Sequence, residues 1–280
     1  MNQPQIPKER MEQMKKEQEA VNARLEKIRH ILLILSGKGG VGKSTVAANL
    51  ALALAEKGKK VGLLDIDIHG PSLPGILGLE GRRLQGTETQ LDPVEYAPNL
   101  KVISIGFLLP EDDNAVIWRG PLKHQVIRQF VSDVNWGDLD YLIVDSPPGT
   151  GDEPLSIAQL LHISRKGDPK SGAVIVTTPQ KVSVTDVRKC VTFCRQVTLP
   201  IMGIVENMSG FVCPKCGERV DLFKTGGGEV MAGEMNVPFL GRIPIDPRVV
   251  EACDSGEAYV TSHAGSPAAE AFQKIAQSLQ

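Results

Sequence analysis

The residues with the clearest chemistry lie between Gly37 and Thr45, where the chain reads Gly-Lys-Gly-Gly-Val-Gly-Lys-Ser-Thr. This string has the phosphate-binding spacing G-x-x-x-x-G-K-[ST]. In that pattern, backbone N–H groups surround the phosphates, Lys43 balances their charge and the Ser44 hydroxyl binds Mg²⁺. We therefore predict a nucleoside triphosphate site formed by the whole loop: Gly37, Lys38, Gly39, Gly40, Val41, Gly42, Lys43, Ser44 and Thr45.

Three aspartates follow apolar runs that predict buried strands. Asp65 and Asp67 come at and just after the end of one run, and Asp145 ends another. Open α/β sheets bind ligands at the carboxyl ends of their strands. We expect Asp145 to hold a water molecule of the Mg²⁺ shell and Asp67 to position the water that attacks the γ-phosphate. Asp65 is expected to support Asp67 or the Mg²⁺ shell. The roles of Asp65 and Asp67 can be exchanged at this stage, and simple capping of the following loop is the alternative for both.

The second informative stretch is the C-x-x-C pair formed by Cys213 and Cys216. This spacing lets two thiolates converge on one metal, but two thiolates complete neither a tetrahedral zinc site nor a four-iron cluster. The remaining cysteines, Cys190, Cys194 and Cys253, are interpreted as packing or bystander residues. Two copies of the chain related by a twofold axis would bring four thiolates together, enough for one [4Fe–4S] cluster or one zinc ion. The spacing does not distinguish iron from zinc.

A parallel sheet is needed to bring these residues to one place. Short apolar runs predict strands at residues 31–35, 60–65, 101–105, 141–145, 173–177 and 201–205, and a further strand ending at residues 241–244. Helices are predicted over residues 46–56, 121–130, 182–196 and 266–279, and residues 80–100 as an irregular surface excursion. The expected fold class is α/β: a single P-loop NTPase domain with a mainly parallel central sheet and helices on both faces.

Two residues near the last strands are candidates for binding the nucleotide base. Asn207 follows the predicted strand at residues 201–205, where its amide is placed to read an adenine edge. Pro244 follows the strand after it and is expected to pack against the base from the other side. The alternative for each is a turn residue without a ligand.

Composition restricts the class of protein. The chain has 280 residues, of which 41% are hydrophobic and 23% charged, with a formal net charge of −2. These values are ordinary for a globular protein and give no electrostatic case for nucleic acid binding. No apolar run approaches the roughly 20 residues of a membrane span. The odd number of cysteines and the absence of an export signal predict a cytoplasmic protein without membrane attachment.

The predicted domain organisation has two parts. Residues 1–30 are expected to form a charged helical extension, because apolar residues recur at helical spacing between positions 8 and 30. Residues 31–280 are expected to form the P-loop ATPase domain, with a cluster-binding insertion near residues 208–224 that carries the C-x-x-C pair.

The phosphate loop with its additional lysine, Lys38, resembles the deviant Walker A motif of dimerising ATPases, in which that lysine reaches the partner's nucleotide. With the strings at residues 65–72, 144–152, 206–209 and 213–216, the chain from residue 31 onward resembles the Mrp (ApbC) family of P-loop iron–sulfur carriers. The resemblance implies slow, Mg²⁺-dependent ATP hydrolysis with Lys38, Lys43 and Asp67 as catalytic residues. It also implies a homodimer bridged by a [4Fe–4S] cluster on Cys213 and Cys216, and delivery of that cluster to apo iron–sulfur proteins.

Two departures from the family pattern matter. Residues 1–30 contain no cysteine, so the second, tightly held cluster of the eukaryotic scaffold relatives is not expected. Lys224 stands where the family usually has glycine, in the stretch that follows the cysteines.

Three rival interpretations remain open. A spatial-organisation ATPase of the partition or division-site type would share the loop, but it would act through DNA or a membrane and leave Cys213 and Cys216 without a role. A dimer with structural zinc at these cysteines would carry no cluster. An ATP-driven electron donor resembling the nitrogenase iron protein would place its cluster cysteines differently.

Overall fold

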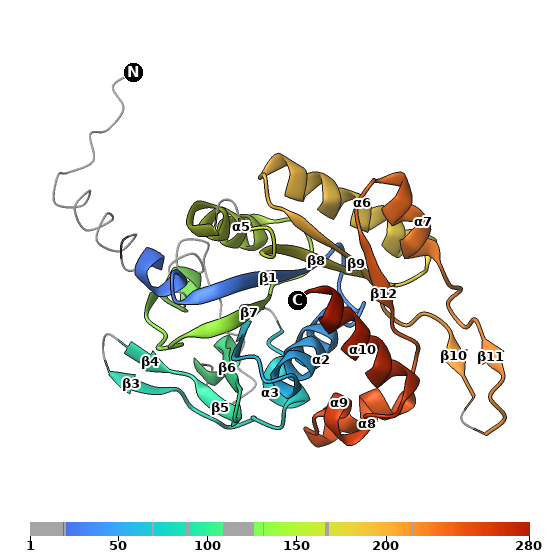
Figure 1. Cartoon of the computed structure of the whole chain (residues 1–280), viewed down its shortest axis with the longest axis horizontal. Coiled ribbons are helices and arrows are strands. Elements are labelled where there is room, and N and C mark those ends of the chain that lie inside the picture. The colour runs from blue at the N-terminus through green and yellow to red at the C-terminus, as the bar shows by residue number, and fades with distance from the viewer. Residues whose placement is uncertain are drawn as a thin grey trace.

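The computed structural model describes residues 19, 21–68, 70–87, 90–108, 126–130, 132–165, 168–213 and 215–280. A central sheet of eight strands crosses the molecule in the order β12-β9-β8-β1-β7-β2-β6-β5 (Figure 1). All neighbours pair in parallel except β5, which runs antiparallel to β6 at one edge. The strands are β1 (Ile28–Ser36), β2 (Val61–Asp65), β5 (Val94–Ala97), β6 (Leu100–Ser104), β7 (Leu139–Asp145), β8 (Gly172–Thr177), β9 (Ile201–Glu206) and β12 (Phe239–Arg242).

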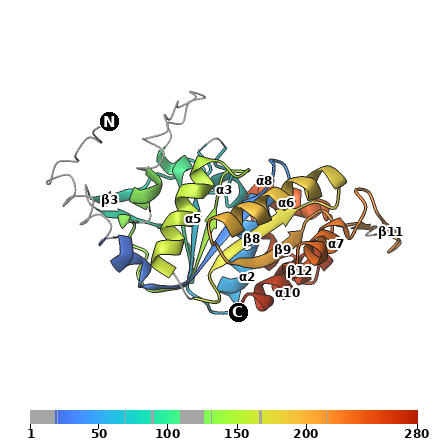
Figure 2. The same cartoon turned by 90° about the horizontal axis from the view of Figure 1, so that it is seen from above.

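Helices cover both faces of this sheet, which confirms the predicted α/β fold with three layers (Figure 2). One face carries α2 (Lys43–Glu56), α3 (Leu73–Ile76), α8 (Pro247–Ser255), α9 (Tyr259–Ser262) and α10 (Pro267–Ser278). The other face carries α5 (Asp152–Arg165), α6 (Lys181–Gln196) and α7 (Gly227–Glu234). A short 3₁₀ turn, η1 (Ile105–Leu108), follows β6.

The two cores follow from the alternation of side chains along the buried strands. In β1, Leu32 and Ile34 belong to the core beneath α2, whereas their neighbours Leu33 and Leu35 belong to the core beneath α6. Because both faces are covered, the strand needs apolar residues at every position, and this explains its unbroken run of Ile and Leu.

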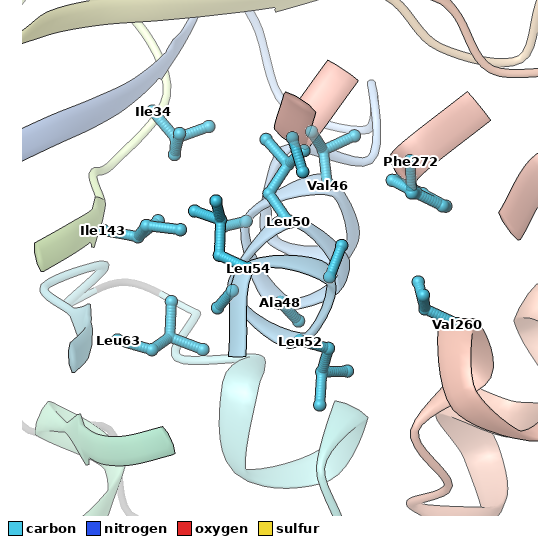
Figure 3. Close-up of a cluster of buried hydrophobic side chains, with 14 of the residues drawn as sticks. Ile34, Val46, Ala48, Leu50, Leu52, Leu54, Leu63, Ile143, Val260 and Phe272 are labelled. Atoms are coloured by element: carbon cyan, nitrogen blue, oxygen red, sulfur yellow. The ribbon is translucent and has the colours of Figure 1, made fainter. Parts of the chain in front are cut away.

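Helix α2 is the centre of the first core. Its side chains lie between strand residues such as Ile143 and the residues Val260 and Phe272 of α9 and α10 (Figure 3). Eleven of its fourteen residues are buried, so small alanines alternate with leucines on a helix that is apolar almost all round. Burial of each large side chain contributes roughly 1.5–3 kcal/mol, which fixes α2, and the phosphate loop before it, firmly against the sheet.

Two small antiparallel hairpins stand outside the central sheet. The first pairs β3 (Gln85–Thr87) with β4 (Gln90–Asp92). Together with β5 it shows that the prediction of an irregular excursion over residues 80–100 was wrong in part, because pairing with β6 orders this polar segment. The second hairpin pairs β10 (Phe211–Val212) with β11 (Arg219–Val220) and projects from the body of the molecule (Figure 1). We call it the cysteine hairpin, because Cys213 and Cys216 lie between its strands.

Four predicted elements have different boundaries in the structure or lie partly outside the described residues. The strand at residues 31–35 begins at Ile28, because Ile28 pairs with Leu139 and His30 with Tyr141. The helix expected over residues 8–30 therefore ends earlier than predicted: residues 21–25 are helical, and the strand begins at Ile28. Most of the predicted length of this helix lies outside the described residues. The helix predicted over residues 121–130 is observed at residues 126–130, and the remainder of it also lies outside. Helix α2 begins at Lys43, three residues earlier than expected.

Candidate functional site

The parallel sheet brings the sequence-predicted residues to one edge. The phosphate loop follows β1, Asp67 follows β2, Asp145 ends β7 and Asn207 follows β9. All four strands are parallel, so their carboxyl ends meet. The Cα atoms of Asp65 and Asp145 are register partners across β2 and β7.

Two glycines of the phosphate loop are required by its surroundings. Gly42 adopts a left-handed conformation with φ of 78°, and a Cβ atom there would lie 2.3 Å from the Nδ2 atom of Asn207. At Gly37, a Cβ atom would lie 2.6 Å from the backbone carbon of Asp186 on α6. The loop is thus packed between α6 and the end of β9, and only glycine allows that approach. It leads into α2, whose first residues, Lys43, Ser44 and Thr45, line the cleft described below, and a helix N-terminus in this position favours phosphate binding.

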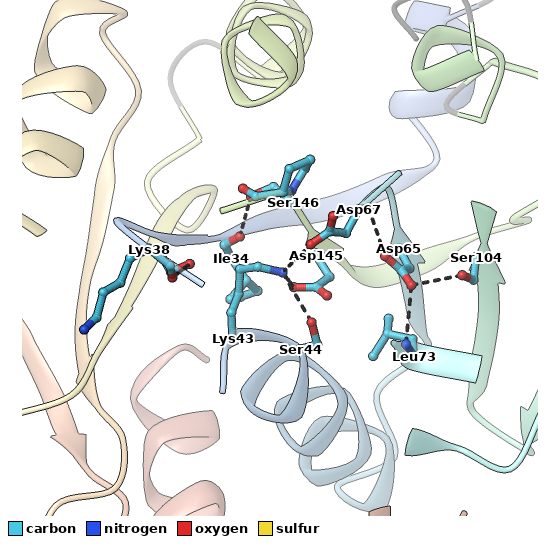
Figure 4. A network of polar contacts seen from close by, with 12 residues as sticks. Ile34, Lys38, Lys43, Ser44, Asp65, Asp67, Leu73, Ser104, Asp145 and Ser146 are labelled. Atoms are coloured by element: carbon cyan, nitrogen blue, oxygen red, sulfur yellow. Dashed lines mark hydrogen bonds and ion pairs between the residues drawn. The ribbon is translucent and has the colours of Figure 1, made fainter. Parts of the chain in front are cut away.

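Lys43 lies at the centre of a buried group of charges (Figure 4). Its Nζ atom is 2.5 Å from Oδ1 of Asp145 and 3.9 Å from Oδ2 of Asp67. The same atom is 3.3 Å from the Ser44 hydroxyl. Burial raises the pKa of Asp145, and the Lys43 ammonium acts in the opposite direction. The lysine therefore neutralises a carboxylate at the point where the phosphates of a nucleotide would compete for it.

The residues present fit a hydrated Mg²⁺ ion. The Ser44 hydroxyl hydrogen-bonds to the carboxylate of Asp145. The second oxygen of that carboxylate, Oδ2, is buried and has no hydrogen-bond partner among the described residues. A buried, unpartnered carboxylate oxygen beside a hydroxyl is the hard oxygen donor set that Mg²⁺ prefers, and a water of the metal shell would satisfy it.

Asp65 has a different position from the other two acids. It is fully buried, and its carboxylate accepts hydrogen bonds from the Asp67 amide at 3.0 Å, the Ser104 hydroxyl at 2.9 Å and the Leu73 amide at 3.4 Å. Burial, together with the charge of Asp145, raises the pKa of Asp65 to about 7. These bonds hold both ends of the loop from residue 66 to residue 73. Of the alternatives left open by the sequence, the geometry favours support of Asp67.

A cleft of about 300 Å³ lies above the phosphate loop. Its lining combines loop residues with groups from the segment after β2 and the turn after β7. Pro148, in the turn-rich loop that the sequence places where a γ-phosphate sensor would sit, lines the cleft, and so does Ser72, for which the sequence predicts no role. Ser72 had a weak signal, because its hydroxyl lies seven residues after Asp65 in a turn-rich stretch. The lining residues are Ser36, Lys38, Gly39, Gly40, Gly42, Lys43, Ser44, Thr45, Asp67, Gly70, Ser72, Ile76 and Pro148.

Lys38 differs from Lys43 in its direction. Its side chain points away from Lys43 and Asp145 (Figure 4). The Lys38 carbonyl accepts a hydrogen bond from the Ser36 hydroxyl at 3.0 Å, which holds the backbone at this position. Lys38 is therefore fixed at the rim of the cleft while its ammonium extends outward.

The two residues predicted to bind the base do not line this cleft. The Asn207 amide donates a hydrogen bond of 2.9 Å to the carbonyl of Val41, inside the phosphate loop. Pro244 lines a separate apolar cleft of about 350 Å³ beside Val212 and α8. The structure thus places Asn207 against the nucleotide loop and Pro244 near the base of the cysteine hairpin.

The cysteine hairpin carries its two thiols at the surface. Cys216 is exposed and Cys213 half-buried. Backbone N–H groups of Cys216 and Lys215 donate to the Cys213 sulfur and lower its pKa, which favours the thiolate. The turn is closed by hydrogen bonds from the Cys213 amide to the Glu218 carbonyl and from the Gly217 amide to the Cys213 carbonyl. Such a turn, with amides directed at sulfur, is suited to metal ligation.

The other cysteines have a different environment. Cys190 and Cys194 are completely buried on α6, and burial raises the pKa of each to about 12. Cys253 is half-buried on α8, and its thiol hydrogen-bonds to Thr45. Among the described residues, no group of three or more His, Cys, Asp or Glu side chains is arranged to hold a metal ion. Cys213 and Cys216 therefore need ligands from outside this set.

The backbone conformation at Lys224 shows why glycine is usual at this position in the family. Lys224 adopts a left-handed conformation with φ of 69°, a region that glycine occupies without steric cost. A lysine is therefore strained at this position, which lies four residues beyond the end of β11 in the cysteine hairpin.

The chain is similar to several known proteins. The family model for the ParA group described as NUBPL iron-transfer P-loop NTPase matches residues 27–280. A nucleotide-binding protein from Archaeoglobus fulgidus, solved in complex with ADP, is 43% identical, with a TM-score of 0.73, over 86% of this chain and 92% of that one. The cell division protein MinD from Aquifex aeolicus is 25% identical, with a TM-score of 0.63, over 89% and 96% of the two chains. MinD from Pyrococcus furiosus is 26% identical, with a TM-score of 0.60, over 89% and 98%. Within the part of the chain that the structure describes, no helix has the length and apolar character of a transmembrane segment.

Proposed function

Since the chain belongs to the family of NUBPL iron-transfer P-loop NTPases, and is thus an ATPase of the P-loop class, we propose that it carries iron–sulfur clusters. In this proposal two copies of the chain hold one [4Fe–4S] cluster as cargo between their cysteine hairpins. The cluster is then transferred to apo-proteins that require it.

The observation that carries the proposal is the state of the C-x-x-C turn. Cys213 and Cys216 lie at the surface on a projecting hairpin, and amide donors favour the thiolate of Cys213. A cubane cluster needs four thiolates, and one chain offers two at this turn. A twofold axis through the hairpin supplies the other two and leaves the cluster close to the surface, where a recipient could take it. The five cysteines are all unpaired, which suits a reducing compartment such as the cytoplasm.

The nucleotide site supports a slow, Mg²⁺-dependent hydrolysis. Lys43 would exchange its contact with Asp145 for the phosphates, while Ser44 and Asp145 would hold Mg²⁺, which supplies charge stabilisation. Asp67 would orient the attacking water, and its backbone N–H is held by the hydrogen bond that it donates to the Asp65 carboxylate.

The outward direction of Lys38 supports a dimeric arrangement. An ammonium that leaves its own cleft is available to the nucleotide of a partner subunit. Closure of the dimer around two nucleotides would then change the geometry of the four thiolates. The amide of Asn207 and the ring of Pro244 remain our candidates for contacts with the adenine base.

The likeness to MinD does not favour a second function. A spatial-organisation ATPase would be supported by a basic amphipathic helix at the carboxyl end. In this chain α10 packs on α2 through Phe272, Ile275 and Ala276, and carries a single lysine, Lys274. We therefore propose neither nucleic acid nor membrane as a partner.

Anaerobic reconstitution with iron and sulfide tests the cargo. The wild type is compared with Cys213→Ala/Cys216→Ala and with the control Cys253→Ala, which removes a cysteine away from the hairpin. We expect about four iron and four sulfide per dimer in the wild type and the control, and none in the double variant. Tightly held zinc that iron does not replace, or clusters retained by the double variant, would refute the proposal.

A further inference from the structure

Glu206 is a buried acid to which the nucleotide chemistry assigns no role. It ends β9 and is completely inaccessible to solvent. Its Oε1 atom accepts hydrogen bonds from the Ser209 hydroxyl at 2.5 Å and the Gly226 amide at 2.8 Å, and Oε2 accepts from the Gly228 amide at 2.5 Å. The Nε atom of Arg242 lies 3.7 Å from Oε1. A buried carboxylate with this many donors is held firmly in one position.

The donors to Oε1 share one property: they are the two ends of the excursion that contains the cysteine hairpin. Ser209 stands immediately before residues 210–225, and Gly226 immediately after them. One oxygen atom therefore holds both ends of the cysteine-bearing segment together. A second set of hydrogen bonds ties the first end to the segment that follows β12, from the Ser209 amide to the Ile243 carbonyl and from the Ile245 amide to the Gly210 carbonyl.

A glycine in the left-handed conformation stands at each end of this excursion. Gly210 has φ of 76° and Gly226 has φ of 83°. Glycines in this region allow backbone rotation that other residues resist. The hairpin thus has a fixed base, held by Glu206, and a pivot on each side of it, which is the construction of a hinge.

The residue next to Glu206 reaches the nucleotide loop. The side-chain amide of Asn207 donates to the Val41 carbonyl at 2.9 Å. The backbone N–H of Asn207 donates to the Thr177 carbonyl of β8 at 2.8 Å. Contact at this point is close, since a single methyl group on Gly42 would collide with the Asn207 amide. Residues 206–209 therefore contact the phosphate loop on one side and, on the other, both ends of the excursion that contains the cysteine hairpin.

We propose that Glu206 and Asn207 are positioning residues that couple the nucleotide loop to the cysteine hairpin. A rearrangement of the loop around phosphates moves the Val41 carbonyl, and Asn207 transmits the movement to the end of β9. Glu206 then shifts the paired ends of the hairpin, which turns on Gly210 and Gly226. The inference rests on the proposed function for its purpose, namely that ATP sets the geometry of the cargo thiolates.

The reactivity of the thiols tests this coupling without any cluster. Alkylation rates of Cys213 and Cys216 in the metal-free protein are measured by mass spectrometry, with and without a saturating non-hydrolysable ATP analogue and Mg²⁺. The buried Cys190 and Cys194 act as internal controls for unfolding. In the wild type we expect the analogue to change the rates at the hairpin by about threefold or more.

The variants separate the coupling from loss of binding. Asn207→Ala should abolish the response to the analogue, at concentrations adjusted to its own measured affinity. Asn49→Ala is the matched control, because the Asn49 side chain also donates to a backbone carbonyl beside the phosphate loop, that of Thr45 at 2.9 Å, but this bond lies within α2. Among the described residues, Asn49 makes no hydrogen bond to β9. We expect Asn49→Ala to retain the full response.

Glu206 is tested at the other end of the connection. Glu206→Gln replaces one of the two accepting oxygens by an NH₂ group, which cannot accept these hydrogen bonds. The hairpin thiols should then react faster both with and without the analogue, and their rates should change less when it is added. Nucleotide affinity should be unchanged. Ser209→Ala removes a single bond to Oε1 and serves where Glu206→Gln does not fold. It should show the same change to a smaller extent.

Three results would overturn the coupling: rates in the wild type that ignore the analogue, a full response in Asn207→Ala, or loss of the response in Asn49→Ala. Each of these is independent of reconstitution. A protein that fails to bind a cluster but shows the expected thiol response would refute the proposed cargo and leave the coupling intact, and the reverse pattern would refute the coupling alone.

Discussion

The pairing of Lys43 with Asp145 leads to a prediction about stability that does not depend on catalysis. The two charged atoms are 2.5 Å apart, and the side chains are only 7% and 0% exposed. Removing one partner from a buried pair leaves a charge without compensation, at a cost of roughly 3–5 kcal/mol. We expect Lys43→Met to lower the free energy of unfolding by about this amount, and Asp145→Asn to lower it by less, because Asp67 still lies 3.9 Å from the lysine charge.

The double variant is the decisive comparison. Lys43→Met/Asp145→Asn removes both charges, so no uncompensated charge remains in the pair. Its destabilisation should be smaller than the sum of the single effects by about 3 kcal/mol, because residues in direct contact are coupled. Asp67, whose Oδ2 atom lies 3.9 Å from Lys43, remains in all three proteins and limits how far the double variant recovers.

The pH dependence of Lys43→Met has a defined sign. Burial already raises the pKa of Asp145, and loss of the lysine that opposes this effect raises it further. The folded state then binds a proton that the unfolded state releases, so the stability of Lys43→Met falls as the pH rises above the ordinary range of an aspartate. The destabilisation of Lys43→Met relative to the wild type should be smaller at pH 5.5 than at pH 8. Its free energy of unfolding should change by at most about 1.4 kcal/mol per pH unit, the limit for one proton.

Urea denaturation of nucleotide-free protein, followed by far-ultraviolet circular dichroism, measures these values. Nucleotide is omitted because binding to the folded state would add its own stabilisation. Single effects that simply add in the double variant would refute the buried ion pair as described. A Lys43→Met protein as stable as the wild type at pH 8 would do the same.

Two further predictions concern Asp65 and Lys224. Burial raises the pKa of Asp65 in the folded protein to about 7. The unfolded state therefore releases this proton at a lower pH than the folded state, and the free energy of unfolding of the wild type should fall as the pH rises from about 5 to about 7. Asp65→Asn should flatten this slope in urea titrations at several pH values, and an unchanged slope would assign the pH dependence to another group. Lys224→Gly should raise the melting temperature by roughly 1–4 °C, because it relieves a left-handed lysine worth about 1 kcal/mol. Lys224→Ala, which keeps the strain, should bring no gain; equal gains in both variants would contradict the explanation.

Much of the fold was predictable because its signals are local. The run of apolar residues in β1, the phosphate loop and the alanine- and leucine-rich α2 follow one another within 30 residues, and each follows from spacing and side-chain type. Errors occurred where distant pairing decides the outcome. Residues 94–97 are polar enough to suggest a loop, but the edge of the sheet accepts them as β5. Ile28 looks helical in its own segment, and its pairing with Leu139 makes it part of β1.

The candidate site shows the same division. Lys43, Ser44, Asp67 and Asp145 were expected because a phosphate loop and acids at strand ends have a known relation in parallel sheets. Asp65 was ambiguous, and only the tertiary structure shows its burial and the hydrogen bond that its carboxylate accepts from the Asp67 amide.

By itself, the sequence determined the order of the elements, the phosphate loop and the pair of cysteines, since these depend on neighbours along the chain. Only the tertiary structure showed that Gly37 must avoid the backbone of Asp186, that Asn207 reaches the Val41 carbonyl, and that Glu206 holds both ends of the cysteine hairpin. The first two contacts join residues that are distant in sequence, and the third joins residues on either side of the cysteine-bearing excursion. Their geometry depends on how β9 and α6 pack beside β1 and β8, and no periodicity or motif encodes that packing.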